Sequence, residues 1–207
     1  MPQDSLELVN FRTDFERPDT SQSAFTRLQH INRYARQICP AWKTLHSPTF
    51  SAKNSIDAAW FQWREQTFHP ILYPALQEAT QFARSGKIRE LCELDQKIST
   101  SLHPAQRLQS STQGHHHAKH SAPPRAEKTA IKFYTAVRQG DTPGNYLIFH
   151  ALRGAIFHLS DQLILATYLF LEVRSHCHGE SESYTQTLID RQLAAPKEKP
   201  QLKTVAI

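Results

Sequence analysis

The chain has little glycine and little cysteine, and both shortages narrow the fold class. Only 6 of its 207 residues are glycine. With few β-branched runs, this argues against a β-sandwich or a barrel. The three cysteines, Cys39, Cys92 and Cys177, lie far apart and form no C-x-x-C pair. A disulfide framework is therefore not expected, and a reducing compartment fits the pattern.

Long apolar stretches are also lacking. The most apolar run, from Leu163 to Leu171, is flanked by Asp161 and Glu172, and it is too short for a bilayer-spanning helix, which needs about 20 apolar residues. The N-terminal residues show neither the basic region nor the apolar core of a signal peptide. We expect a cytoplasmic protein with no membrane association.

Motifs of common catalytic sites are missing from the sequence. It contains no phosphate-binding glycine loop, no G-x-S-x-G, no H-E-x-x-H and no aspartate-rich diphosphate motif. We therefore predict a non-catalytic protein without a tightly bound cofactor. The net charge of +5 and the pI of about 9.2 are only mildly basic, and Lys and Arg are scattered along the chain. Nucleic acid is thus not an expected partner.

Helical periodicity is the main pattern that the sequence does have. Apolar residues recur at spacings of three and four in most segments, for example at Ile88, Leu91, Leu94, Ile98 and Leu102. The pattern predicts an all-α, single-domain helical bundle of about eight or nine helices. We place the helical domain at residues 21–194, after a flexible arm at 1–20 and before a disordered tail at 195–207.

Two further expectations concern individual helices. Pro70 and Pro74 are expected to interrupt the pattern and to separate two helices. The segment from Asp161 to His178 has apolar residues nearly all round, so it is expected to be the central buried helix.

A cluster of histidines follows at residues 115–120. His115, His116, His117 and His120 are expected at the exposed end of a helix, where His116 and His120 share one face. Neutral imidazoles spaced in this way can bind Ni²⁺ or Zn²⁺. The alternative is a solvated polar helix end with no metal role.

The helix before the histidines carries Arg107, Ser110 and Gly114 on one side. Gly within a helix costs roughly 0.5–1 kcal/mol against Ala, a cost often accepted where another helix packs closely. Ser110 and Gly114 are thus candidates for helix packing, with a partner-binding face as the alternative. Arg107 is a candidate for partner binding or for an internal ion pair.

Over about residues 60–190 the chain resembles the urease accessory protein UreF family. The resemblance rests on the order and spacing of several pieces: FQWR at 61–64, LQEA at 76–79, GK at 86–87, LD at 94–95, and R-x-x-S-x-x-x-G from Arg107 to Gly114. A later pair of segments, HALRG at 150–154 and the apolar helix with Tyr168 and Arg174, is similar to the family's penultimate helices. The family's N-terminal L-P-x-G motif has no counterpart before Ser55.

This resemblance implies a non-catalytic scaffold that dimerises and assembles a nickel-delivery complex. Its implied partners are a UreD/UreH-like accessory protein, a UreG-like GTPase and urease, with Tyr168 and Arg174 added to the residues for partner binding or packing. Two other classes stay open. A metal-binding helical protein or a haem oxygenase/thiaminase-like enzyme predicts inward His and Glu around a central pocket. A nucleic-acid-associated helical protein predicts Lys and Arg on one face.

Overall fold

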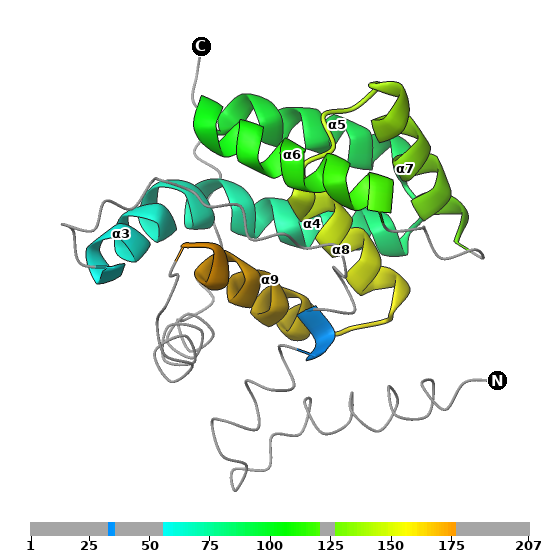
Figure 1. Ribbon diagram of the computed structural model, residues 1–207. Helices are drawn as coiled ribbons and strands as arrows, with labels where there is room; N and C mark the ends of the chain where they lie inside the picture. The colour runs from blue at the N-terminus through cyan, green and yellow to red at the C-terminus, as the bar shows by residue number, and fades with distance from the viewer. Residues whose placement is uncertain (1–32, 36–55, 121–126, 177–207) are drawn as a thin grey trace, which may run out of the picture.

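The computed structural model describes residues 33–35, 56–120 and 127–176, which are all helical or in short connections (Figure 1). Over these residues the chain forms seven α-helices, one π-helix and a helical turn at 33–35. The all-α prediction is confirmed, with slightly fewer helices than expected. The predicted arm at 1–20, the tail at 195–207 and residues 21–32, 36–55, 121–126 and 177–194 of the predicted helical domain lie outside the described residues.

The chain stays helical at Pro70, where a break was expected, and the helix around Pro70 is a π-helix instead of an α-helix. Helix α3 (Ile56–Trp63) continues into the π-helix η1 (Arg64–Leu72) and then into α4 (Tyr73–Arg84). Proline in an α-helix clashes with the carbonyl four residues before it. The wider π turn accommodates it, and the Tyr73 amide donates to the Phe68 carbonyl five residues back. The prediction of two separate helices was therefore wrong.

Three helices follow, with ends near the predicted ones. They are α5 (Ile88–Ser101), α6 (Pro104–His120) and α7 (Lys128–Gln139). Gly86 and Gly140 end α4 and α7 with φ of +68° and +81°, a left-handed conformation that glycine adopts without steric cost. In Figure 1, α5, α6 and α7 gather on one side of the molecule.

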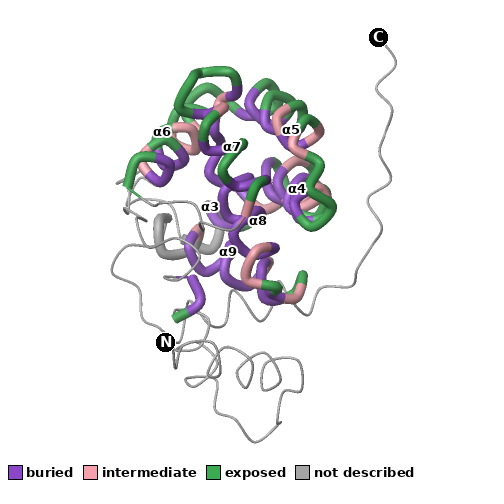
Figure 2. Tube along the Cα trace, turned by 90° about the vertical axis from the view of Figure 1, so that its right-hand side faces the viewer, coloured by how far each residue is buried: buried purple, intermediate pink, exposed green. Residues whose placement is uncertain are grey.

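The central helix is α8 (Tyr146–Ile156), in which every residue from Tyr146 to Ala155 is buried. It packs against α4, α6 and α9, and Figure 2 shows it within the buried interior. We had expected α9 (Asp161–His176) in this place. That expectation was wrong, because α9 exposes Asp161 and Gln162 and only half-buries Leu165 and Glu172.

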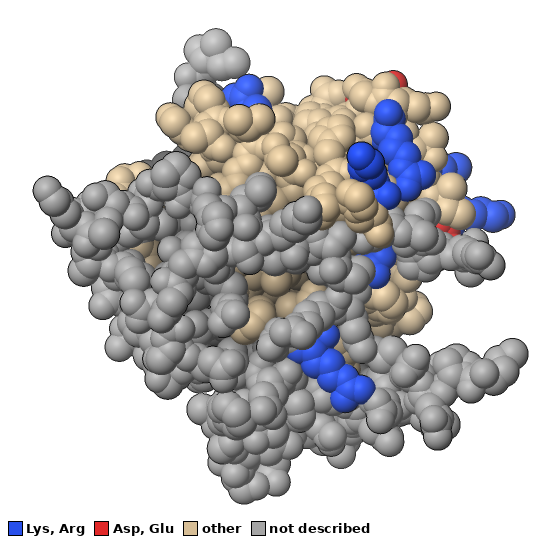
Figure 3. All heavy atoms as spheres, viewed as in Figure 1, with Lys and Arg blue, Asp and Glu red and all other residues tan. Residues whose placement is uncertain are grey.

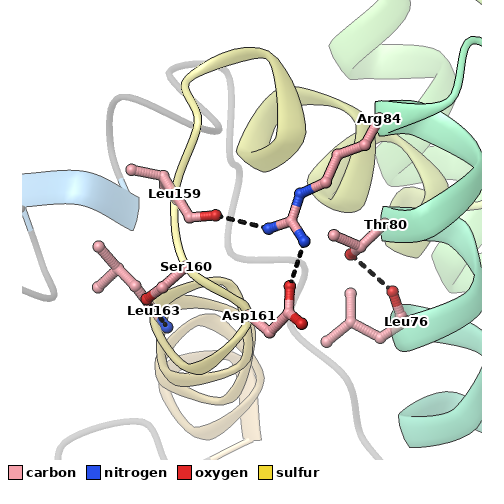
Figure 4. A network of polar contacts seen from close by, with 7 residues as sticks. All are labelled: Leu76, Thr80, Arg84, Leu159, Ser160, Asp161 and Leu163. Atoms are coloured by element: carbon pink, nitrogen blue, oxygen red, sulfur yellow. Dashed lines mark hydrogen bonds and ion pairs between the residues drawn. The ribbon is translucent and has the colours of Figure 1, made fainter. Parts of the chain in front are cut away.

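The start of α9 is fixed to α4 by one arginine (Figure 4). One guanidinium nitrogen of Arg84 donates to the Leu159 carbonyl at 2.8 Å, and the other lies 2.7 Å from the Asp161 carboxylate. Ser160 caps the helix by accepting from the Leu163 amide at 3.3 Å. The turn between α8 and α9 is thus held against α4.

No helix among the described residues is long and apolar enough to cross a membrane.

Candidate functional site

The first turn of α8 is buried, and two neighbouring helices supply acceptors for the Tyr146 amide and for the amides of the two residues before it. A helix start leaves its first N–H groups without partners inside the helix. Here Asn145 precedes the helix but its side chain makes no capping bond. Instead, Asp95 of α5 and Ser110 of α6 reach across to the start of α8. This junction of α5, α6 and α8 is the best-defined polar site in the described part of the molecule.

Asp95 is the hub of the junction and is fully buried. One carboxylate oxygen accepts from the Thr142 hydroxyl and from the Gly144 amide, both at 2.6 Å. The other accepts from the backbone and side-chain nitrogens of Asn145, at 2.8 and 2.7 Å. The carboxylate therefore joins α5 to the loop before α8. The carboxylate also lies at the N-terminal end of α8, where the helix dipole favours a negative charge.

The electrostatics of Asp95 combine two opposing effects. Burial raises the pKa of its carboxyl group, and the hydrogen bonds from Thr142, Asn145 and Gly144 work in the other direction. The sequence pattern marks Asp95 only by its place after Leu94. A clue was available in its position on the apolar face of α5, where Leu91, Leu94 and Ile98 are buried with it.

Ser110 and Gly114 both face α8, on the same side of α6. The Ser110 hydroxyl accepts a hydrogen bond from the Tyr146 amide at 3.2 Å. At Gly114 a Cβ atom would overlap the Gly144 carbonyl group and lie 3.1 Å from the Phe149 ring. Gly144 in turn has φ of +74°. Two backbones thus meet at Gly114, and a side chain there has no space.

Arg107 differs from its two neighbours in the motif, because its side chain is exposed. Among the described residues its guanidinium group makes one long hydrogen bond, 3.4 Å from a nitrogen to the Leu102 carbonyl. The guanidinium group is thus left at the surface near the start of α6, beside the exposed Leu108.

The four histidines are divided among three environments. His117 is buried, where its Nε2 lies 2.8 Å from the Tyr134 hydroxyl. Burial, with a smaller effect of the Arg153 cation, lowers the pKa of His117 to about 3. His115 is exposed, with Nε2 3.1 Å from the Pro143 carbonyl. The expectation of four exposed histidines was therefore wrong for His117, which faces the core because it lies one turn beyond Gly114.

His116 and His120 do share a face, as their spacing predicts. Their ring centroids are 4.4 Å apart, and His120 is exposed. Over the described residues, no group of three or more His, Cys, Asp or Glu side chains could hold a metal ion. Only a two-histidine site is thus available in α6.

Tyr168 belongs to a second buried network, around His150 of α8. The His150 Nε2 lies 3.0 Å from the Ile164 carbonyl, which can only accept, so the ring carries its proton there. Its Nδ1 then accepts from the Tyr146 hydroxyl at 3.0 Å. The Tyr168 ring packs 5.4 Å from His150. Burial lowers the pKa of His150 to about 4 and, with the charge of Glu172, raises the pKa of Tyr168.

Tyr168 is only 3% exposed, so it packs within the fold and offers little surface to a partner. Arg174 lies in the last turns of α9, and its side chain is outside the described residues. A small pocket of ≈ 40 Å³ opens beside Tyr168, lined among others by Ser110, Gln113 and Glu172. This volume has room for water molecules and is far below that of the pockets that hold organic ligands.

Comparison with models of known protein families identifies the family of the chain. The model of the UreF family matches residues 57–178, which is more than half of the chain. The chain belongs to the UreF family. A search of curated proteins finds no match, and neither does a search of solved structures.

The UreF match covers all of the junction described above. It begins inside α3 and ends just after α9, so it contains Asp95, Ser110, Gly114 and the loop before α8. It also contains the histidines of α6. The resemblance drawn from the sequence, at about 60–190, overlaps this range closely. Membership in the UreF family places the chain among urease accessory proteins.

Proposed function

We propose that this chain is a non-catalytic scaffold that dimerises and organises nickel delivery to urease. Its partners in this role are a UreD/UreH-like accessory protein, a UreG-like GTPase and urease itself. The observation that carries the proposal is the UreF family match over residues 57–178. Nickel in this scheme is cargo, passed to urease by the complex.

The geometry of α6 supports a scaffolding role. Ser110 and Gly114 fix α6 to α8 through a hydrogen bond and a close backbone contact. Arg107 lies on the same helix with its guanidinium group exposed. A charge held on a rigid helix can contact a partner with little loss of conformational entropy. We therefore assign Arg107 to partner binding, and Ser110, Gly114 and Tyr168 to packing.

The buried titratable groups also favour a structural role. The Asp95 carboxylate accepts bonds from the loop before α8, His117 bonds to Tyr134, and His150 bonds to Tyr146 and to the Ile164 carbonyl. A catalytic acid or base needs to reach a substrate. These three groups are instead occupied by the fold itself.

Co-purification tests this proposal directly. The tagged chain is co-expressed with the UreD/UreH-like protein, the UreG-like GTPase and the urease subunits of its own host. The wild type is expected to recover the accessory proteins, and Arg107→Ala is expected to recover less of them at an unchanged melting temperature. Lys97→Ala, an exposed change on α5, is the matched control. Recovery of none of these proteins by the wild type would contradict the proposal.

A further inference from the structure

Positive charge predominates on the outer surface of α6 and α7, although the acidic residues Glu127 and Asp141 lie just outside the two ends of α7. Between them the two helices contain Arg107, Lys119, Lys128, Lys132 and Arg138 and no Asp or Glu, and all five cations are exposed. Figure 3 shows blue side chains gathered over the region of α6 and α7 on the face in view. Five exposed cations thus lie on two consecutive helices.

Elsewhere in the described structure, three arginines pair with neighbouring carboxylates, whereas the exposed Lys87 and Lys97 form no ion pair with a described residue. Arg64 pairs with Glu65, Arg84 with Asp161, and Arg89 with Glu93. None of these three pairs, which are the ion pairs among the described residues, involves α6 or α7. Arg138 has a structural contact, donating to the Ala118 carbonyl at 2.6 Å, which ties the end of α7 to the end of α6. The cations of α6 and α7 form no ion pair with another described residue, so their charge is available to a partner.

Apolar side chains are exposed within the same surface. Among the described residues three large hydrophobic side chains are exposed, and two of them are Leu108 of α6, at 68%, and Ile131 of α7, at 40%. On α7, Ile131 shares the outward stripe with Lys128, Lys132 and Thr135, at spacings of three and four. On α6, Leu108, Thr112, His115 and Lys119 form the equivalent stripe. We call these two stripes the α6–α7 surface.

We propose that the α6–α7 surface docks an acidic protein surface, and that its occupant is one of the urease-maturation partners; the choice of occupant rests on the proposed function. Complementary charge around apolar contacts is the usual arrangement of a protein interface. A phosphate backbone would use the lysines but would gain nothing from Ile131 or Leu108. A metal ion could use only the His116 and His120 pair of α6, weakened by the nearby Lys119, and would gain nothing from the other cations or from Ile131 and Leu108.

The test reverses charge on the proposed surface and on a matched control. Lys128→Glu/Lys132→Glu changes two exposed lysines of α7, and Lys87→Glu/Lys97→Glu makes the same change in charge at two exposed lysines at the start of α5 and within it. Affinity of the full chain for each purified accessory protein and for urease is measured at two salt concentrations. Melting temperature and circular dichroism confirm that each variant is folded.

We expect the α7 variant to bind at least one partner about tenfold more weakly than the wild type, with reduced salt dependence, while the control stays within about twofold. Ile131→Ser should weaken the same interaction. Equal affinities of the α7 variant and the control for every partner would overturn the proposal. So would tight binding of duplex DNA that only the α7 variant loses, with partner binding intact.

The proposed function can fail while the docking proposal is still tested. If the wild type binds none of the urease-maturation proteins, the proposed function fails. Titration with poly-L-glutamate then still decides whether this surface selects acidic polypeptides. Binding lost in the α7 variant and kept in the control supports an acidic docking surface with another occupant, and equal binding by both variants overturns it.

Discussion

Gly114 of α6 lies directly against the carbonyl group of Gly144, in the loop that leads into α8. A Cβ atom at position 114 would overlap that carbonyl. The contact lets α6 approach closely enough for Ser110 to accept from the Tyr146 amide. One backbone contact thus sets the distance at which the polar junction of α5, α6 and α8 can form.

Replacing Gly114 is therefore expected to destabilise the fold. Gly114→Leu forces the two backbones apart and should lower the free energy of unfolding by about 1–3 kcal/mol or more, as overpacking does. Denaturant unfolding measures this, with Thr112→Leu, an exposed change in the same helix, as the control. Equal stability of the two variants would show that the contact does not constrain α6.

Asp95 gives a second stability prediction. Asp95→Asn places an amide N–H₂ group among the Thr142, Gly144 and Asn145 donors, so buried donors lose their acceptor. We expect a loss of about 2–4 kcal/mol in the free energy of unfolding. Asp141→Asn, at the exposed neighbouring position, should change little. A stable Asp95→Asn variant would mean that the junction does not depend on the carboxylate.

The two buried histidines predict how stability depends on pH. Their pKa values are about 3 for His117 and about 4 for His150 in the folded chain, against the ordinary histidine value of 6.5. Between these values and 6.5 the unfolded chain binds more protons, so stability rises with pH. We expect the free energy of unfolding to fall from pH 7 to pH 5. The limiting slope is about 1.4 kcal/mol per pH unit for each histidine.

The pH prediction is checked by measuring denaturant unfolding across that range in the wild type and in His117→Gln/His150→Gln. The double variant should show a shallower slope, and His103→Gln/His120→Gln, at exposed positions, should keep the original one. Asp95, whose pKa burial raises, contributes with the opposite sign and is present in all three proteins. If replacing His117 and His150 left the slope of stability against pH unchanged, the low pKa values of these two histidines would be contradicted.

The sequence predicts the helices well because their limits are local. Gly86, Gly140 and Pro104 mark helix ends through their own backbone preferences, and the structure places the ends there. The continuous helix through Pro70 was missed, since a π turn depends on how nearby side chains pack. The Asp95 junction was missed for another reason. Its partners lie about fifty residues away, and only the folded chain brings them together.

The histidine cluster also shows that sequence spacing cannot predict contacts between helices. Spacing alone correctly predicts that His116 and His120 share a face. Spacing does not show which side of α6 is covered by the other helices, and His117 lies on that covered side. The functional site is thus less predictable than the fold, because it depends on which helix faces meet.

The pair of His116 and His120 remains a candidate for weak binding of Ni²⁺ or Zn²⁺. Two imidazoles one turn apart can bind a divalent ion with water completing the coordination, and the nearby Lys119 weakens the affinity. Isothermal titration of His116→Ala/His120→Ala should lose most of the heat seen for the wild type, whereas His103→Ala should keep it. Unchanged heat in the double variant would make the pair incidental.

The central claim is that the chain serves urease maturation, and nickel content of urease tests it most directly. Urease is co-expressed with the UreD/UreH-like and UreG-like proteins of the same host, with and without this chain, in medium containing nickel. The account predicts nickel-loaded, active urease only when the chain is present, and a reduced yield with Arg107→Ala. Urease that acquires the same nickel and activity without the chain would contradict it.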